Sequence, residues 1–249
     1  MKLFVVSFFL IFFPSFSLAA EPQQEQTLPP VVVTATRVET PQEQVTTSLS
    51  VITSDDIRAQ QAVTVEEVLR HVTGVDVVQS GSRGSTTSVF IRGANSNQAL
   101  VLVDGMEVNS VTAGNFDFAH LLTENVERIE VLRGSGGALY GSKAVGGVIN
   151  IITKKGRGTP QIALSAEGGN GRSHREVLGL SGSHGALSYS LSPSYLRTDG
   201  FRSANDSYRN GAVSARLDYD LIKDGALRAI LNMTDTSLGL VNDDVSCEA

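Results

Sequence analysis

The sequence has little cysteine, little positive charge and, beyond its first twenty residues, no long hydrophobic run. Its one cysteine, Cys247, excludes an intramolecular disulfide. Asp and Glu total 26 against 20 Lys and Arg, which gives a formal net charge of -6 and an isoelectric point of about 5.2. Nucleic-acid-binding domains usually carry a basic patch and a high isoelectric point. We therefore expect no nucleic-acid partner.

The one long apolar run covers residues 3–13, between the pair Met1 and Lys2 and the small residues at 17–20. It is about half as long as the ~20 residues that a membrane-spanning helix needs. The pattern predicts a secretory signal peptide over residues 1–20, cleaved after Ala19 or Ala20. Six of the ten Phe lie within it, so the exported chain is poor in large apolar residues. No later run is long enough for a transmembrane helix.

Residues 21–47 have the composition of a linker. They begin with a polar, Gln-rich stretch, and Pro29 and Pro30 favour an extended backbone. Residues 31–34, three Val and a Thr, then form a short β-prone island. Two interpretations stay open for this island. It could add as a strand to the sheet edge of a partner protein, or it could be an edge strand of the next domain.

Residues 48–157 are typical of a compact α+β domain. Thr53 with Asp56, and Thr64 with Glu67, have the spacing of helix capping boxes. Apolar, β-branched runs predict strands, and Asp104-Gly105 predicts a turn. Residues 126–132 alternate apolar and charged side chains, as a half-buried strand does. The predicted strands cover residues 48–53, 75–78, 88–92, 100–103, 126–132 and 148–153.

Residues 160–235 contain segments of about ten residues with alternating polarity, which is the weak signature of a transmembrane β-barrel. The turn signals Gly169-Asn170, His184-Gly185 and Asp224-Gly225 lie between them. A soluble β-sandwich gives a similar pattern, and the signal peptide is what favours the barrel. The predicted strands cover residues 161–167, 176–183, 188–196, 212–219 and 226–234.

The glycine-rich stretch at 133–147 matches neither common nucleotide-binding motif. A dinucleotide fingerprint would need Gly at Leu139, and a P-loop would need Lys at Ser142. The four His are scattered, with surface or turn positions expected. Asp199, Asp206 and Asp218 are poorly spaced for a shared cation. We therefore predict no enzyme, no catalytic residues, no cofactor and no metal site.

Four segments together resemble the TonB-dependent outer-membrane receptors. They are VVVTATR at 31–37, FIRGANSNQALVLVDG at 90–105, VERIEVLRG at 126–134 and YGSKAVGGVINIITKK at 140–155. The first resembles the TonB box of the family, and the other three resemble its plug domain. Residues 90–109 and 126–153 are most similar to the vitamin B12 (cobalamin) receptors. Ser135 departs from the pattern, since the family usually has Pro there.

The resemblance implies an α+β plug domain followed by the first antiparallel strands of a transmembrane β-barrel of about 22 strands, incomplete in this chain. The implied organisation is a signal peptide (1–20), a periplasmic leader with the TonB box (21–47), the plug (48–157) and the barrel strands (158–249). A barrel of about 22 strands, each of about ten residues, needs a longer chain than this one. We therefore expect an N-terminal fragment. The implied location is the bacterial outer membrane.

The resemblance also implies partners and residue roles. The partners are TonB with its inner-membrane energising complex, outer-membrane lipid and a small-molecule ligand, with cobalamin favoured over a ferric siderophore or haem. The TonB box would pair with TonB as an added strand. Arg92 and Arg133 would meet carboxylates of the barrel wall, although solvated arginines are the plainer interpretation. Two plug loops would face ligand, or be ordinary surface loops. The TonB-box residues are Val31, Val32, Val33, Thr34 and Ala35, and the loop residues are Gly81, Ser82, Arg83, Gly84, Ser85, Val111, Thr112, Ala113, Gly114 and Asn115.

A different class of function stays open beside this one. A plug-like domain in the periplasm could bind a ligand or TonB without transporting anything. Membrane insertion of a longer product would separate the two functions.

Overall fold

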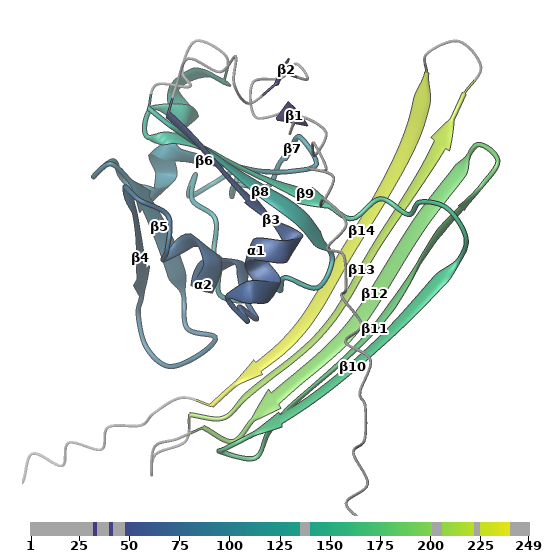
Figure 1. Ribbon diagram of the computed structural model, residues 1–249. Coiled ribbons are helices and arrows are strands. Elements are labelled where there is room, and N and C mark those ends of the chain that lie inside the picture. Colours follow the sequence, from purple (N-terminus) through teal and green to yellow (C-terminus); the bar gives the residue numbers. More distant parts are fainter. Residues whose placement is uncertain are drawn as a thin grey trace, which may run out of the picture. The chain divides into compact units, whose positions relative to one another are not determined.

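The computed structural model describes residues 32–33, 40–41, 48–134, 140–200, 206–221 and 225–239 (Figure 1). The predicted signal peptide, most of the leader, the Asp224-Gly225 turn in part, and Cys247 lie outside these residues. Within them, no helix combines the length and the apolar character that crossing a membrane requires.

The first part of the described chain is built on a mixed five-stranded sheet, which we call the plug sheet. Its order is β3-β8-β9-β6-β7, and only the β6–β9 pair is parallel. Its first strand in sequence order, β3, therefore lies at one edge. The strands are β3 (Ser48–Thr53), β6 (Ala99–Val103), β7 (Met106–Glu107), β8 (Val126–Arg133) and β9 (Gly147–Thr153).

Two short helices follow β3, as the capping boxes predict. In α1 (Ser54–Ala59) the Thr53 hydroxyl donates to the Asp56 carboxylate at 2.7 Å and accepts from the Asp56 N–H at 3.3 Å. Ahead of α2 (Val65–Leu69) the Glu67 carboxylate accepts from the Thr64 N–H at 3.3 Å. These bonds satisfy backbone groups that a helix end leaves free.

A two-stranded sheet and two 3-10 turns complete this part of the fold. The hairpin of β4 (Val75–Gln79) and β5 (Thr87–Ile91) is antiparallel, and η2 (Ser96–Gln98) and η3 (Gly141–Ala144) precede β6 and β9. Asp104 and Gly105 adopt φ values of +49° and +84°, the left-handed conformations of a tight hairpin turn. The predicted turn is confirmed.

The core lies between the plug sheet and the two helices. Val65, Val68 and Leu69 from α2 pack with Ile129 and Ile149 from the sheet, and all five are fully buried. A second, smaller cluster lies apart from this core and takes the alternate side chains of the same strands, among them Leu100, Leu132 and Val148.

The prediction that residues 126–132 form a half-buried strand is wrong at Glu130. Its side chain is fully buried, although the alternation predicts a solvent-facing position. Arg128, on the same face two residues earlier, donates to it at 2.8 Å, and Asn150 donates from the neighbouring β9 at 3.3 Å. A buried carboxylate is tolerated where a cation and an amide satisfy it.

The second part is an antiparallel meander of five long strands in chain order, which we call the wall sheet. All five predicted strands are confirmed, and each is longer than predicted. Gly185 (φ +56°) falls at the predicted His184-Gly185 turn, whereas the first turn lies at 170–172, after the predicted Gly169, which still pairs with Ser173. The strands are β10 (Gln161–Gly169), β11 (Ser173–His184), β12 (Leu187–Thr198), β13 (Tyr208–Asp220) and β14 (Ala226–Leu238).

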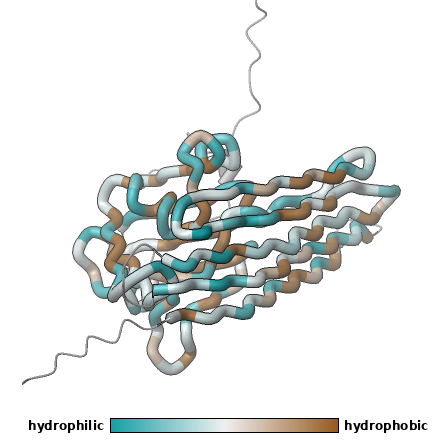
Figure 2. The backbone as a smooth tube through the Cα atoms, turned by 90° about the horizontal axis from the view of Figure 1, so that it is seen from below, coloured by the Kyte–Doolittle hydropathy of each residue, from teal (hydrophilic) through white to brown (hydrophobic). Residues whose placement is uncertain are grey.

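The two faces of the wall sheet differ in polarity, which the alternating colours along the strands show (Figure 2). On β12, Ser188, Ser190, Ser192 and Ser194 are buried. The alternate positions carry exposed apolar side chains such as Leu191, and neighbouring strands continue this face. Its other members include Ile162, Leu164, Tyr195, Val213, Leu217, Tyr219, Leu227, Leu231 and Met233.

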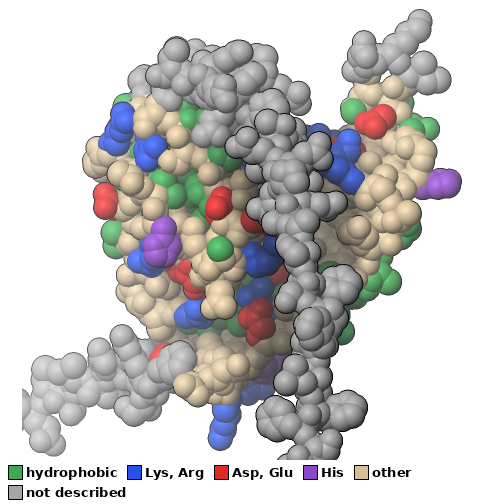
Figure 3. Space-filling model, in the orientation of Figure 1, with side chains coloured by type: hydrophobic (Ala, Val, Ile, Leu, Met, Phe, Trp, Pro, Cys, Tyr) green, Lys and Arg blue, Asp and Glu red, His purple; other side chains and the backbone are tan. Residues whose placement is uncertain are grey.

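This apolar face is large for a water-soluble surface. Figure 3 shows hydrophobic side chains along the right-hand margin, over the long strands, while the plug surface mixes acidic and basic side chains. An outward apolar face, a polar inner face and long antiparallel strands are the features of a transmembrane barrel wall. The five strands do not close into a barrel within the described residues.

Two side-chain truncations, one in the core and one at the surface, should differ in their effect on stability. Ile149→Ala removes a fully buried side chain of β9 and should destabilise the plug sheet by about 2–5 kcal/mol. Val78→Ala removes a side chain that is 57% exposed and should change stability by less than ~0.5 kcal/mol. Hydrogen-exchange mass spectrometry of β8 and β9 peptides measures both. Equal protection in the two variants would contradict the assigned core.

Candidate functional site

The predicted coupling segment lies mostly outside the described residues, which exclude Val31, Thr34 and Ala35. Val32–Val33 forms β1, and it pairs antiparallel with β2 (Thr40–Pro41). A ladder of two residues per strand is too short to be stable by itself. The leader therefore offers a strand that a longer partner strand could replace, and the role of the segment remains a prediction.

Arg92 and Arg133 come together beside Gly74. They line one cavity with Ser48, Ser50 and Thr73, and the Arg133 guanidinium donates to the Thr73 carbonyl. Gly74 has φ +77° and lies against the stems of both arginines. Among the described residues, neither arginine forms an ion pair with a wall carboxylate. Their predicted contact with the wall remains a prediction.

The predicted ligand loop at 81–85 is the tip of the β4–β5 hairpin. Backbone bonds close it, from Ser80 N–H to Thr86 O and from Ser85 N–H to Ser82 O, both at 3.0 Å. Arg83 pairs with Glu67 of α2 at 2.9 Å, which ties the loop to the helix cap. The loop is therefore held at its base and at Arg83.

The second predicted loop, at 111–115, is held by the buried Asn109 side chain and by backbone bonds of Ser110 to Gly114 and Asn115, both at 2.8 Å. The Asn109 amide donates to the carbonyls of Ala99 at 3.0 Å and Gly114 at 2.8 Å, and its oxygen accepts from the Val101 N–H at 2.7 Å. Val111 at the tip is 99% exposed. The arrangement gives a fixed base and a free tip, which suits a loop that contacts a ligand. No other described feature tests that role.

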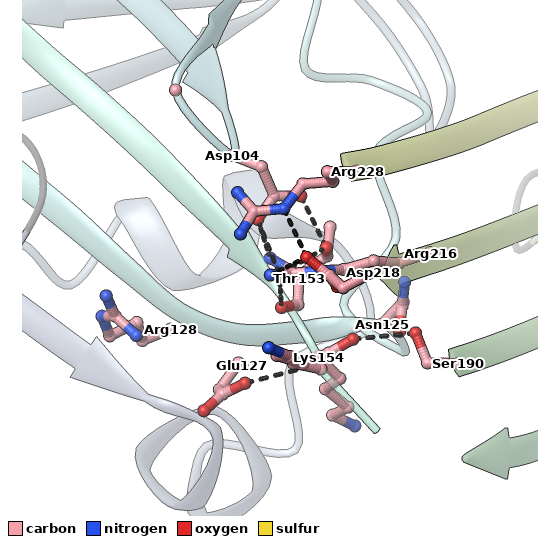
Figure 4. A network of polar contacts seen from close by, with 12 residues as sticks. Asp104, Asn125, Glu127, Arg128, Thr153, Lys154, Ser190, Arg216, Asp218 and Arg228 are labelled. Carbon is pink, nitrogen blue, oxygen red and sulfur yellow. Dashed lines mark hydrogen bonds and ion pairs between the residues drawn. The ribbon is translucent and has the colours of Figure 1, made fainter. Parts of the chain in front are cut away.

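A buried cluster of charges joins the plug sheet to the wall sheet (Figure 4). Arg216 of β13 donates to the Asp104 carboxylate at 3.0 Å and to the Thr153 carbonyl at 2.8 Å. Asp104 also accepts from the Thr153 hydroxyl at 2.5 Å and the Thr153 N–H at 3.0 Å. One carboxylate thus connects the β6–β7 turn, the end of β9 and the wall.

The wall completes the cluster with two more charges. Asp218 accepts from Arg216 at 2.6 Å and from Arg228 of β14 at 2.7 Å. Two carboxylates and two guanidinium groups give the cluster no net charge. The side chains of Asp104, Asp218 and Arg216 are 1%, 2% and 6% exposed. Charges so buried require partners, and each of them has one.

A second ion pair joins the two sheets at Glu124, in the loop before β8. Its carboxylate lies 3.1 Å from the Arg175 guanidinium of β11 and is 4% exposed. Burial raises the pKa of the Glu124 carboxyl above its usual range, although the Arg175 charge acts in the opposite direction. Lys154, whose pKa burial lowers, donates to the Glu124 backbone carbonyl at 2.7 Å.

Neutral hydrogen bonds fill the space between the charged groups. The Asn125 amide donates to the Ser214 hydroxyl of β13 at 2.8 Å, and Ser214 donates to Asn232 of β14 at 2.6 Å. Ser190 of β12 donates to the Lys154 carbonyl at 2.8 Å. We call this whole set of contacts the polar seam. It uses the serine-rich face of the wall sheet.

Tyr208 is the one large aromatic side chain in the seam, and it is fully buried. Its hydroxyl lies 3.0 Å from the His120 Nδ1 and accepts from the Asn210 amide at 2.8 Å, and its ring stacks on the His120 ring at 5.9 Å. A β-carbon added at Gly84 would lie 2.3 Å from the same ring. The predicted ligand loop therefore packs directly on the wall.

Sequence reasoning missed the seam. His120 lies in a turn, as predicted, but no pattern in the sequence indicated that its ring stacks on Tyr208 of the wall. Asp218, considered together with Asp199 and Asp206, instead belongs to the charge cluster, and no group of metal-ligating side chains is found among the described residues. The available signal was the run of polar residues at alternate positions of β12 and β13, with Arg216 and Asp218 on the inner face.

The raised pKa of Glu124 predicts a pH dependence. A carboxyl whose folded-state pKa exceeds its unfolded value stabilises the fold at low pH, and this contribution is lost as pH rises through the folded pKa. The stability of the wild type relative to Glu124→Gln should therefore increase as pH falls from neutral towards the ordinary value of 4.5. Urea unfolding of both proteins across this range measures it. A difference that is constant with pH would contradict the burial of an ionisable Glu124.

The contact between Gly84 and Tyr208 predicts a contrast between two glycines. Gly84 (φ +85°) and Gly93 (φ +75°) share a left-handed backbone, but a β-carbon at Gly93 meets nothing within 4 Å. Gly93→Ala should cost only backbone strain, about 1 kcal/mol. Gly84→Ala should also push the loop off the wall. Faster hydrogen exchange at 80–86 in Gly84→Ala alone is expected, and equal exchange in both variants would contradict the contact.

Comparison with known proteins shows which proteins this chain is similar to. Residues 41–148 match the TonB-dependent Receptor Plug Domain. The vitamin B12 transporter BtuB of Vibrio vulnificus is 47% identical over 148 residues, which are 59% of this chain and 24% of that protein. BtuB of Photobacterium profundum is 39% identical over 200 residues, 75% of this chain and 32% of that protein. The chain thus spans about a quarter to a third of the length of these curated relatives.

Two solved structures share the fold. The ferripyoverdine receptor of the Pseudomonas aeruginosa outer membrane aligns with a TM-score of 0.71 at 22% identity, over 83% of this chain and 28% of that one. The siderophore receptor PirA of Acinetobacter baumannii aligns with a TM-score of 0.58 at 27% identity, over 76% of this chain and 31% of that one. The predicted resemblance, the fold class and the absence of enzymatic function are confirmed. Residues 41–148 thus carry the plug domain of the TonB-dependent receptors, and the antiparallel strands that follow have the fold of part of the barrel wall in the solved receptors.

Proposed function

We propose that this chain is the N-terminal part of a receptor that imports a scarce nutrient across the bacterial outer membrane, driven by TonB. The polar seam is the observation that carries the proposal, because it packs the plug on the polar inner face of a wall whose other face is apolar. Such a plug closes the lumen of a barrel without being part of its sheet. The outer membrane has no energy source of its own, so opening requires a partner that reaches across the periplasm.

The coupling step follows from the leader. In the proposal, the segment from Val31 to Ala35 pairs as an added strand with TonB, which transmits force from the inner-membrane proton gradient. The short β1–β2 ladder supports this, because few bonds are lost in the exchange. The predicted domain boundaries at 20, 47 and 157 belong to the same proposal.

The ligand is a cobalamin-like compound in this proposal, in preference to a ferric siderophore or haem. The support is the 47% identity to a vitamin B12 transporter, against 22% and 27% identity to the two solved receptors described above. The loops at 81–85 and 111–115 would contact the ligand from the plug side. The alternative function, a non-transporting periplasmic module that binds ligand or TonB, predicts binding without uptake.

A backbone variant in the leader tests the coupling step. Val33→Pro removes the N–H that an added strand donates, so it should abolish uptake and leave ligand binding to cells unchanged. Gln24→Pro, in the polar stretch before the box, is the matched control and should retain uptake. Radiolabelled cyanocobalamin uptake is measured with the complete reading frame in cells that lack their own cobalamin receptor, with and without TonB.

The outcomes separate the alternatives. TonB-dependent uptake that Val33→Pro abolishes supports the transporter. Binding of cyanocobalamin without any uptake would support the binding module instead. Uptake of a ferric siderophore or haem, tested in the same cells, would retain the transport proposal and overturn the ligand.

A further inference from the structure

We propose that the ion pair between Asp104 and Arg216 is the anchor that keeps the β6–β9 part of the plug on the barrel wall during transport, while the β3 edge yields. This rests on the proposed function, since it concerns the state of the receptor under the pull of TonB. Three features of the pair make it an anchor: the number of elements that it joins, its charge balance and its place in the sheet order.

The pair joins more elements than any other contact of the polar seam. Asp104 receives bonds from Arg216 on the wall and from both the N–H and the hydroxyl of Thr153. Arg216 in turn reaches the Thr153 carbonyl. Thr153 is the last residue of β9, immediately before the segment that leads into β10. Movement of this end of the plug sheet away from the wall must break the bonds from Arg216 to Asp104 and to Thr153 together.

The charge balance makes the anchor depend on both partners. Asp218 holds Arg216 from the wall side at 2.6 Å, and Asp218 is itself paired with Arg228 at 2.7 Å. If Asp104 departs, Arg216 remains bound to Asp218, but Asp104 loses the only cation that pairs with it among the described residues, while it stays bonded to Thr153. Separation therefore leaves an uncompensated carboxylate in the plug, which opposes separation.

The sheet order places the pulled strand at the far edge. The leader enters the plug sheet at β3, which pairs only with β8, while β6 and β7 lie at the other edge. Among the described residues, no side-chain hydrogen bond or ion pair joins β3 to the wall sheet. A pull on the leader thus loads the β3–β8 ladder first, and the anchor resists at the opposite edge.

The test uses the complete receptor with Cys247→Ser and one reporter cysteine. Ile52→Cys reports on β3 and Val101→Cys on β6; both positions are buried. Labelling with a membrane-impermeant maleimide is compared in cells with and without TonB, in the presence of cyanocobalamin. With no further substitution, the cysteine at position 52 should be labelled only when TonB is present. The cysteine at position 101 should not be labelled in either case.

Arg216→Met keeps the side-chain stem and removes the charge. With TonB present, labelling at position 101 should then be about tenfold faster than without TonB. The double variant with Asp104→Asn should recover part of the protection, since it leaves no unpaired carboxylate. Arg209→Met is the matched control, on the exposed face of the same strand, and should behave as the wild type. Two results would overturn the anchor. One is that the cysteine at position 101 stays unlabelled in Arg216→Met; the other is that it is labelled equally with and without TonB.

A second readout needs no TonB, so it separates the two proposals. In the purified receptor, Arg216→Met should speed hydrogen exchange at 102–107 and 153–157 by about tenfold and leave 48–53 unchanged. No change at the first two segments overturns the anchor, whether or not the receptor transports. If the exchange changes as expected but position 52 never responds to TonB in the wild type, the proposed function fails and the structural anchor remains.

Discussion

Asp104 and Arg216 come from different sheets, and both side chains are almost excluded from solvent. A buried charge without its partner is costly, so the plug sheet and the wall sheet constrain each other through this contact. The other contacts of the polar seam also reach the inner face of the wall sheet, from several of its strands. Arg175 meets Glu124, Ser214 meets Asn125, and Tyr208 meets His120, each from a position on the inner face of the wall.

The chemistry of the seam suits a part that must stay in place and still be released. An apolar interface of this size would behave like a core and would resist both water and separation. Hydroxyl, amide and ionic groups can exchange their partners for water as they part. The serine positions of β12 provide such a surface, while the opposite face of the same strand is apolar. One strand therefore meets two different environments through simple alternation.

The local elements could be predicted from sequence because their causes are local. Thr53 and Asp56 cap α1 across three residues, and the Asp104-Gly105 turn needs only two left-handed residues. The alternation of the long strands likewise follows from the period of a β-strand. The family resemblance supplied the order of the parts.

The seam could not be predicted because its partners lie far apart in the sequence. Asp104 and Arg216 are 112 positions apart, and His120 and Tyr208 are 88 apart. Glu130 was misjudged for a related reason, since its burial depends on Arg128 and on Asn150 from another strand. A charged residue in an alternating pattern suggests solvent until its partner is known.

The seating of the plug on the inner face of β13 is the central claim, and a disulfide tests it most directly. The side chains of Asn125 and Ser214 are in contact at 2.8 Å, whereas Val213 next to Ser214 faces the opposite side and is exposed. In a Cys247→Ser receptor, cysteines at 125 and 214 should form a disulfide in isolated outer membranes, and cysteines at 125 and 213 should not. Equal cross-linking of both pairs, or cross-linking through 213 alone, would contradict this seating.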